Sequence, residues 1–315
     1  MGAFTSRPVQ REAGLIVDEG LQYDSTTISP PMTQVMVPDA KEKLCAILER
    51  QVALDIEVEG NQFCRMCCCQ PNMNWTVFEP LDDLDPSADT FEMGKALMKI
   101  KESSPWAGRC VSFFCPGGRP TSYTVDDIAL HREVMRFQKG CTCGQSCCMV
   151  TVSMHPMSWL CGWPIRFPLC CCLPFLSTLD ADGVEIGKSQ ILCDQNFCVP
   201  KIAVSVYDKP TYIVYPDTCL YGFCPVCTCD APGQGSWFLR SPFHIRDLNG
   251  NRYEHAAIRD PRSSHQLAKK GWCSRGNLYS LDFPNNATVY EKAALMGAVM
   301  LIDISLFEQD TAFLG

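Results

Sequence analysis

The stretch from Ala293 to Phe307, AALMGAVMLIDISLF, decides the fold of this chain. Ten apolar or small residues run without a break and are followed by Asp303 and four mostly apolar residues. A membrane-spanning helix needs about 20 apolar residues, whereas this run of 15 residues covers about 22 Å as a helix. Because the run is apolar on every side, we expect a helix enclosed by the protein's own fold, with a spanning anchor and an interfacial helix as alternatives. Asn286 and Thr288 are the candidate N-cap residues.

The composition is typical of a packed globular protein. The chain has 315 residues, of which 46% are hydrophobic and 20% are charged, enough for one large domain or two ordinary domains. The net charge is −8 and the strongest basic run is Lys269-Lys270, so we expect no nucleic-acid partner. The N-terminal sequence MGAFTSRPVQREAG lacks the apolar core of a signal peptide.

No motif of a familiar enzyme class is present in the sequence. A nucleophile elbow, a phosphate-cradling loop, an HExxH motif and a dinucleotide fingerprint are all missing. The five histidines are scattered, and none stands in a recognisable catalytic pattern. We therefore expect a non-enzymatic function, with catalysis by cysteine and histidine residues far apart in the chain as an open alternative.

The 22 cysteines are the most unusual feature of the composition, and they cluster at 64–69, 141–148, 169–173 and 224–229. Adjacent triplets and the lack of an export signal favour reduced, cytosolic cysteines over a secreted disulfide scaffold. Structural zinc would need two short pairs, and the available pairs, at 64/67 and 224/227, lie far apart in the sequence. Burial of cysteine as a small hydrophobe and S-acylation are the other two interpretations.

S-acylation is the interpretation that we favour for two of these clusters, because thioester-linked chains add membrane affinity beside apolar segments. The expected attachment residues are Cys141, Cys143, Cys147, Cys148, Cys170, Cys171 and Cys172. A second lipid signal is the N-terminal MGAFTS, in which Gly2 and Ser6 fit the N-myristoylation pattern. One myristoyl chain binds membranes only marginally, so the two signals together would give stable anchoring.

Most of the chain after the first hundred residues predicts β-hairpins. Alternating residues flank an acidic or glycine turn in three stretches, 122–137, 175–191 and 243–258. Asp180-Ala181-Asp182-Gly183 also resembles the start of a calcium loop, but position twelve is Ile191, so we interpret it as a hairpin turn. Further strands are expected at 201–208 and 211–216. Hairpins followed by one wholly apolar helix predict a sheet closed into a barrel around that helix.

Four other segments complete the expected organisation. They are a polar arm at 1–40, an amphipathic helix at 41–57, an acidic surface loop at 80–95 and an apolar loop at 158–177. The last contains three prolines, which prevent a spanning helix, and two tryptophans. It suits either a membrane interface or packing on the barrel or a partner, and both interpretations stay open.

The order of these features resembles the phospholipid scramblase family, within the tubby-like superfamily. Residues 283–308, FPNNATVYEKAALMGAVMLIDISLFE, are similar to the family ending FPxxxxxxxKAxxxGAxxLIDxxxFE, in which Lys292, Gly297 and Asp303 match. Residues 108–137, GRCVSFFCPGGRPTSYTVDDIALHREVMRF, resemble the family's Arg-Pro hairpin segment. The clusters CTCGQSCC at 141–148 and CLYGFCPVCTC at 219–229 fall where the family has its cysteine-rich stretches.

The resemblance implies a mainly β fold, a tubby-like closed barrel of about twelve strands around a hydrophobic C-terminal helix. The barrel domain would cover 41–310, with insertions near 70–95 and 158–180 and the central helix at 293–307. It further implies attachment to the cytosolic face of a plasma or organelle membrane. There the protein would move phospholipids between leaflets, with calcium and without ATP, which is transport rather than enzyme chemistry.

Calcium is the one cofactor that the resemblance suggests, and the sequence departs from the pattern that would bind it. The corresponding stretch is RGNLYSLDFPNN at 275–286, in which Asn277, Asp282 and Asn286 are the candidate ligands. It holds a single carboxylate and begins with Arg275, whereas calcium is bound by several oxygens. An alternative function is therefore a non-catalytic structural subunit that uses the barrel to dock within a multi-protein assembly.

Overall fold

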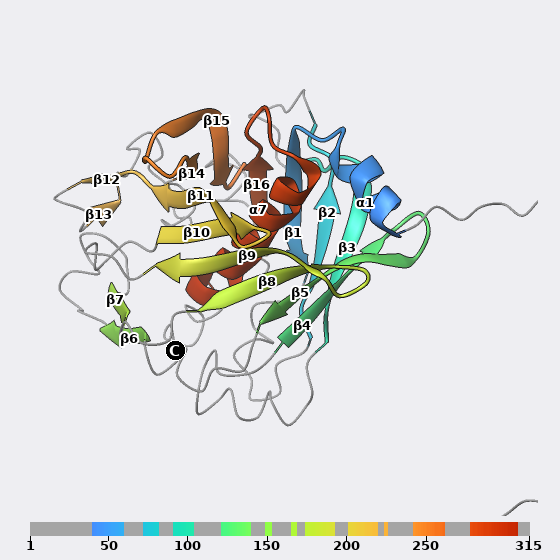
Figure 1. The fold of residues 1–315 in the computed structure, drawn as a ribbon, viewed down its shortest axis with the longest axis horizontal. Helices are drawn as coiled ribbons and strands as arrows, with labels where there is room; N and C mark the ends of the chain where they lie inside the picture. Colours follow the sequence, from blue (N-terminus) through green and yellow to red (C-terminus); the bar gives the residue numbers. More distant parts are fainter. Residues whose placement is uncertain are drawn as a thin grey trace, which may run out of the picture. The chain divides into compact units, whose positions relative to one another are not determined.

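Twelve strands of the described chain form one closed antiparallel barrel, with the C-terminal helix running through it (Figure 1). The structure is a computed structural model. It describes residues 40–59, 72–81, 91–103, 121–139, 149–152, 165–168, 174–192, 201–219, 224–225, 242–261 and 278–307. The expected mainly β barrel around a C-terminal helix is confirmed.

The barrel closes where the first strand pairs with the last. The strand order around the ring is β1-β16-β15-β14-β11-β10-β9-β8-β5-β4-β3-β2. The strands are β1 (Ala53–Glu59), β2 (Asn74–Phe78), β3 (Ala96–Ser103), β4 (Thr121–Asp127), β5 (Arg132–Lys139), β8 (Phe175–Asp180), β9 (Glu185–Leu192), β10 (Lys201–Val206), β11 (Lys209–Pro216), β14 (Phe243–Arg246), β15 (Arg252–Arg259) and β16 (Leu278–Asp282). Closure leaves no unpaired edge, which an open sheet would have to protect.

Two small sheets stand apart from the barrel. They pair β6 (Met149–Val152) with β7 (Ile165–Pro168), and β12 (Thr218–Cys219) with β13 (Cys224–Pro225). The helical elements within the described residues are α1 (Ala40–Leu48), α7 (Val289–Ile302) and a π-helical turn, η3 (Asp303–Phe307). The expected arm lies outside the described residues apart from Ala40, which begins α1.

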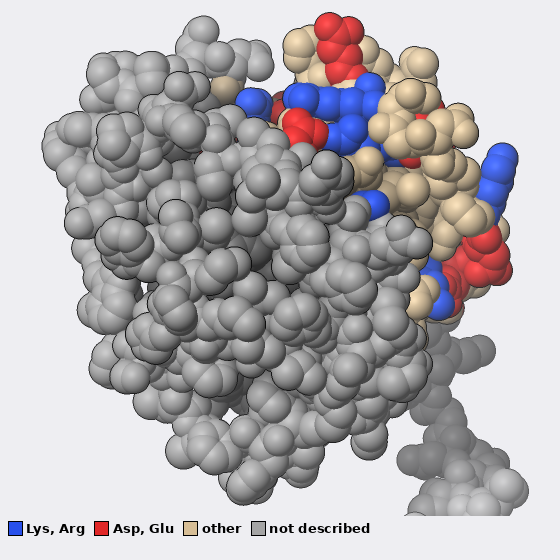
Figure 2. All heavy atoms as spheres, turned by 90° about the vertical axis from the view of Figure 1, so that its left-hand side faces the viewer, with Lys and Arg blue, Asp and Glu red and all other residues tan. Residues whose placement is uncertain are grey.

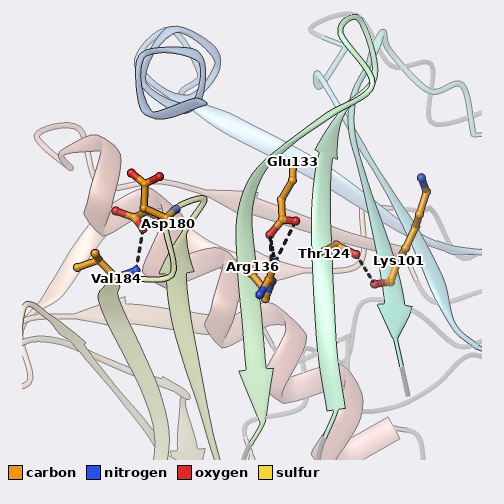
Figure 3. Close-up of polar contacts among 7 residues, drawn as sticks. Lys101, Thr124, Glu133, Arg136, Asp180 and Val184 are labelled. Atoms are coloured by element: carbon orange, nitrogen blue, oxygen red, sulfur yellow. Dashed lines mark hydrogen bonds and ion pairs between the residues drawn. The ribbon is translucent and has the colours of Figure 1, made fainter. Parts of the chain in front are cut away.

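All three hairpins expected from turn residues are present, as β4–β5, β8–β9 and β14–β15. In the β8–β9 turn, Asp180 Oδ1 accepts hydrogen bonds from the backbone N–H groups of Asp182 (3.0 Å) and Val184 (2.8 Å), and Gly183 adopts φ +82°. Asp180 therefore serves as a turn residue. Figure 3 shows this turn beside an ion pair on β5, in which Arg136 Nη2 lies 2.8 Å from Glu133 Oε1.

The helix expected over 41–57 is shorter than the sequence pattern suggested. α1 ends at Leu48, and residues from Ala53 onward form β1. Val52, which the helical pattern would bury, is 79% exposed. The competing pattern is the alternation ALDIEVE at 53–59, which lets β1 pair with β16 on one side and with β2 on the other. Strand β2 lies inside the range near 70–95, so this part of the range belongs to the barrel.

Helix α7 is enclosed by the barrel. Its side chains from Lys292 to Ile302 are all buried, and it packs against β8, β9, β10 and β16. Thr288 is the N-cap in a capping box, donating its backbone N–H to Glu291 Oε2 (2.7 Å) and accepting from the Glu291 N–H (3.3 Å). In the described part of the chain, no helix is both long enough and apolar enough to span a bilayer.

Two glycines allow α7 to lie close against the barrel wall. A Cβ atom at Gly187 on β9 would come within 2.7 Å of the Ala294 Cβ, and one at Gly297 on the helix would come within 2.8 Å of Thr178 Oγ1. Both distances are shorter than van der Waals contact. The packing therefore selects glycine at these positions despite its unfavourable helix propensity at Gly297.

Replacing Gly297 by alanine should destabilise the protein. In an exposed helix the change would stabilise by about 1 kcal/mol, but overpacking against Thr178 costs about 1–3 kcal/mol. We expect a net loss of about 1 kcal/mol in the free energy of unfolding, measured by urea denaturation.

The matched control is Thr178→Ala, which removes a hydroxyl that has no hydrogen-bond partner among the described residues. The double variant should recover the stability that Gly297→Ala loses. Stabilisation by Gly297→Ala alone would contradict the steric explanation.

Candidate functional site

Lys292 joins the N-terminal turn of α7 to the end of α1. Its Nζ donates hydrogen bonds to the carbonyl oxygens of Leu48 (2.9 Å), Glu49 (3.3 Å) and Gln51 (2.7 Å). An ammonium group has three donors, so all of them are used. The last carbonyls of a helix lack intrahelical partners and carry partial negative charge, which makes a buried cation favourable there. Burial lowers the pKa of Lys292, and the charge of Glu49 partly opposes this.

Asp303 fixes the other end of the helix. Its carboxylate accepts hydrogen bonds from Trp75 Nε1 on β2 (3.1 Å) and from the Tyr279 hydroxyl on β16 (2.6 Å). All three side chains are buried, and the ring of Trp75 stacks edge-to-face on Tyr123 with centroids 5.4 Å apart. A charged side chain can stay in the apolar interior because polar donors satisfy it. The aspartate within the apolar run is therefore a contact to the barrel.

The three residues singled out in the central helix thus all contact the barrel or the segment leading into it. Lys292 and Asp303 form hydrogen bonds at the two ends of α7, and Gly297 between them permits close packing on β8. These contacts explain why the sequence keeps a cation, a glycine and an anion in an otherwise apolar helix.

The calcium candidates do not gather into an acidic cluster in the described part of the chain. Asp282 lies at the end of β16, where Arg259 Nη2 is 3.1 Å from its Oδ2. Burial raises the pKa of Asp282, and the Arg259 charge partly opposes this. Asn286 is exposed in the turn before α7, and Asn277 lies outside the described residues. Within the described ranges, no group of three or more His, Cys, Asp or Glu residues is arranged to hold a metal.

A cavity of about 430 Å³ opens where β16 leads into α7. Its walls come from the segment before β1, from β14 and β15, and from the first turn of α7. Two residues that the sequence singled out separately, Asp282 and Lys292, line it together. The charged and titratable lining residues are Arg252, Arg259, Lys292, His244, His255 and Asp282.

His244 is buried, like Lys292, and an ion-pair cluster orients it. Its Nε2 lies 3.4 Å from Asp217 Oδ2, and Asp217 also pairs with Arg246 and, at 3.7 Å, with Arg252. Its Nδ1 has no hydrogen-bond partner among the described residues. Burial lowers the pKa of His244, and Asp217 partly opposes this shift. Figure 2 shows cationic and acidic side chains side by side on the described part of one face.

The lipid-attachment residues cannot be compared with the structure. Gly2 lies outside the described residues, as do Cys141, Cys143, Cys147, Cys148, Cys170, Cys171 and Cys172. Acylation and myristoylation stay predictions.

We did not predict this cavity from the sequence, although the sequence contains a pattern that indicates it. The hairpin FHIRDLNGNRYEHAAIR carries a cation or an imidazole at positions 244, 246, 252, 255 and 259. The turn residues Asn249 and Gly250 in this segment predict only a hairpin. Charge patterning on a predicted hairpin that precedes a buried helix could have marked the site.

Comparison of the chain with protein-family models, with curated proteins and with solved structures finds no match.

Asp303→Leu should be strongly destabilising, because it leaves two buried donors without their acceptor. Each such loss costs about 1–3 kcal/mol, so we expect a fall of about 3 kcal/mol or more in the free energy of unfolding, measured by urea denaturation. Tyr279→Phe, which removes one donor and leaves Trp75 in place, should cost about 2 kcal/mol. Wild-type stability of Asp303→Leu would show that Asp303 does not hold the helix.

Stability should also depend on the protonation of His244. Because its pKa is lower in the folded than in the unfolded protein, the unfolded chain binds more protons below about pH 6.5. The free energy of unfolding should therefore fall as the pH drops from about 7.5 to about 5.5. Urea denaturation at both pH values should show a smaller fall for His244→Gln than for wild type. An equal fall in His244→Gln would rule out this contribution.

Proposed function

We propose that the chain is a scramblase-like protein that associates with the cytosolic face of a membrane and moves phospholipids between leaflets without ATP. The observation that supports this proposal is a closed barrel of twelve strands around an apolar C-terminal helix. The motif residues Lys292, Gly297 and Asp303 each make a contact that this enclosure requires. Acylated cysteines would supply the membrane anchor.

Two features limit the form that the activity takes. Helix α7 is enclosed, and the hydrogen bonds described above satisfy Lys292 and its C-cap residue Asp303, so we expect lipid to contact the outside of the barrel and not the helix. Asp282 is engaged by Arg259, so the proposal does not depend on calcium at this residue.

A second candidate is a non-catalytic structural subunit of a multi-protein assembly. The observation that favours it is the complete use of Lys292 and Asp303 in internal contacts. A helix retained for folding needs no lipid activity, and a fold alone does not carry function.

Reconstitution into vesicles distinguishes the two functions. Full-length protein, acylated and reconstituted with fluorescent phospholipid, should let dithionite quench the inner leaflet of unleaky vesicles, with and without calcium. Folded and inserted protein that gives no quenching would reject the scramblase-like function and favour the structural subunit.

Membrane attachment is tested separately with cysteine variants. Replacing Cys141, Cys143, Cys147 and Cys148 by serine should move the protein from the membrane fraction to the supernatant. Cys45→Ser is the matched control, because this cysteine is a free thiol in α1, outside the clusters. Unchanged fractionation of the quadruple variant would remove the proposed anchor.

A further inference from the structure

We propose that the cavity beside the first turn of α7 binds a phosphate-bearing ligand, either a phospholipid headgroup or a small soluble phosphate ester. The site requires no lipid movement, so it goes beyond the proposed function and would exist in either candidate function. Four independent features of the described residues carry the proposal: charge, an unused buried nitrogen, backbone strain and size.

The charge around the cavity favours an anion. Among the described lining residues, three cations, Arg252, Arg259 and Lys292, stand against one carboxylate, that of Asp282. Asp217, which is not a lining residue, lies 3.7 Å from Arg252 and offsets it in part. The three donors of Lys292 go to carbonyl oxygens, and no carboxylate of the described residues pairs with it directly. The arginine side chains are about half exposed, at 49% for Arg252 and 56% for Arg259, and they can reorient towards a phosphate, which guanidinium groups bind in bidentate fashion.

The second feature is the free nitrogen of His244, a side chain that is only 4% exposed. Because Nε2 faces the Asp217 carboxylate, Nε2 carries the proton and Nδ1 is the acceptor. Burying a polar atom without a partner is costly. Nδ1 has almost no accessible surface in the structure, so a phosphate would supply the partner once the His244 side chain turns towards the cavity, where Nδ1 can accept from the hydroxyl of a monoanion. This is a reason for a histidine in the wall of the cavity that folding alone does not give.

The third feature is the strained backbone of His255. It adopts φ +62°, a left-handed conformation that costs a residue with a side chain about 1–3 kcal/mol. The pairing of β14 with β15 shifts register between His244 and Arg246, so β15 is bulged opposite this point. Bulges re-aim side chains and are common beside binding sites. Here the bulged segment places His255 in the lining of the cavity.

The size of the cavity sets the class of ligand. A volume of about 430 Å³ lies within the range of small-molecule sites, roughly 300–1,000 Å³. It holds a phosphate together with a few carbon atoms. sn-Glycerol 3-phosphate is therefore a suitable probe, because it is also the headgroup portion of phosphatidic acid.

The first experiment measures binding of glycerol 3-phosphate to the full-length protein by calorimetry at low salt, with glycerol as the uncharged control. The double variant Arg252→Gln/Arg259→Gln should weaken binding about tenfold or more, because it removes charge-assisted hydrogen bonds. Arg136→Gln is the matched control, a partly buried arginine of β5 that pairs with Glu133 and does not line the cavity (Figure 3). It should bind as wild type.

Asp282→Asn gives the sharpest result, because it removes the single carboxylate among the described lining residues and should tighten binding several-fold. Damage to the fold would not produce tighter binding. Two outcomes would overturn the proposal. In the first, both the double arginine variant and Asp282→Asn keep wild-type affinity. In the second, the wild-type protein binds neither the soluble probe nor the vesicles.

The second experiment identifies the source of the phosphate. Protein with serine at the clustered cysteines, which removes the proposed anchors, is sedimented with phosphatidylcholine vesicles with and without phosphatidic acid. Phosphatidic acid-dependent binding that the double arginine variant loses supports a headgroup ligand, and soluble binding alone supports a phosphate ester. Vesicle binding that survives the double variant, without soluble binding, overturns the site. Lipid movement is measured in parallel by dithionite quenching, and its result is independent of whether the cavity binds phosphate.

Discussion

Enclosing one helix on all sides is the constraint on which the rest of the structure depends. A helix surrounded by protein has no water to satisfy its polar groups, so every charge that it carries needs a partner inside the fold. Lys292 meets this need with three carbonyl oxygens, and Asp303 meets it with Trp75 and Tyr279. These partners lie on α1 and the segment after it, on β2 and on β16. Helix α7 can therefore take its position only when the early elements α1 and β2 have come together with the late strand β16.

Closure of the barrel follows from the same requirement. Tyr279 pairs across the sheet with Ile56 on β1, and Trp75 on β2 pairs with Val58 on the other side of β1. The two donors to Asp303 thus flank the strand at which the ring closes. The register of β1 sets the separation of these donors, and a one-residue slip would turn its inward side chains outward. Helix position and barrel register are consequently coupled, and neither is determined by local sequence alone.

Local sequence predicted the elements whose cause is local. Asp180 and Gly183 specify a turn through their own hydrogen bonds and φ angle, and Thr288 with Glu291 specifies a helix start. It failed at residues 53–57, because helical and strand patterns overlapped there and pairing with β16 and β2 decided between them. It also missed the cavity, since His244, Arg259 and Lys292 come from three separate elements. No single stretch of sequence shows that these elements meet.

The end of the barrel where α7 enters holds both a contact that stabilises the fold and the cavity that we propose to bind an anion. Lys292 donates to the carbonyl oxygens at and after the end of α1, and its side chain lines the cavity, where it pairs with no carboxylate among the described residues. Arg259 holds Asp282, which would otherwise add negative charge at the same place. The bulge in β15 then adds His255, whose φ of +62° is a strained conformation, to the lining of the cavity. The contact of Lys292 with the end of α1, which the fold needs, thus also contributes to the positive charge of the cavity. The strained hairpin β14–β15 beside it supplies the groups that could recognise an anion.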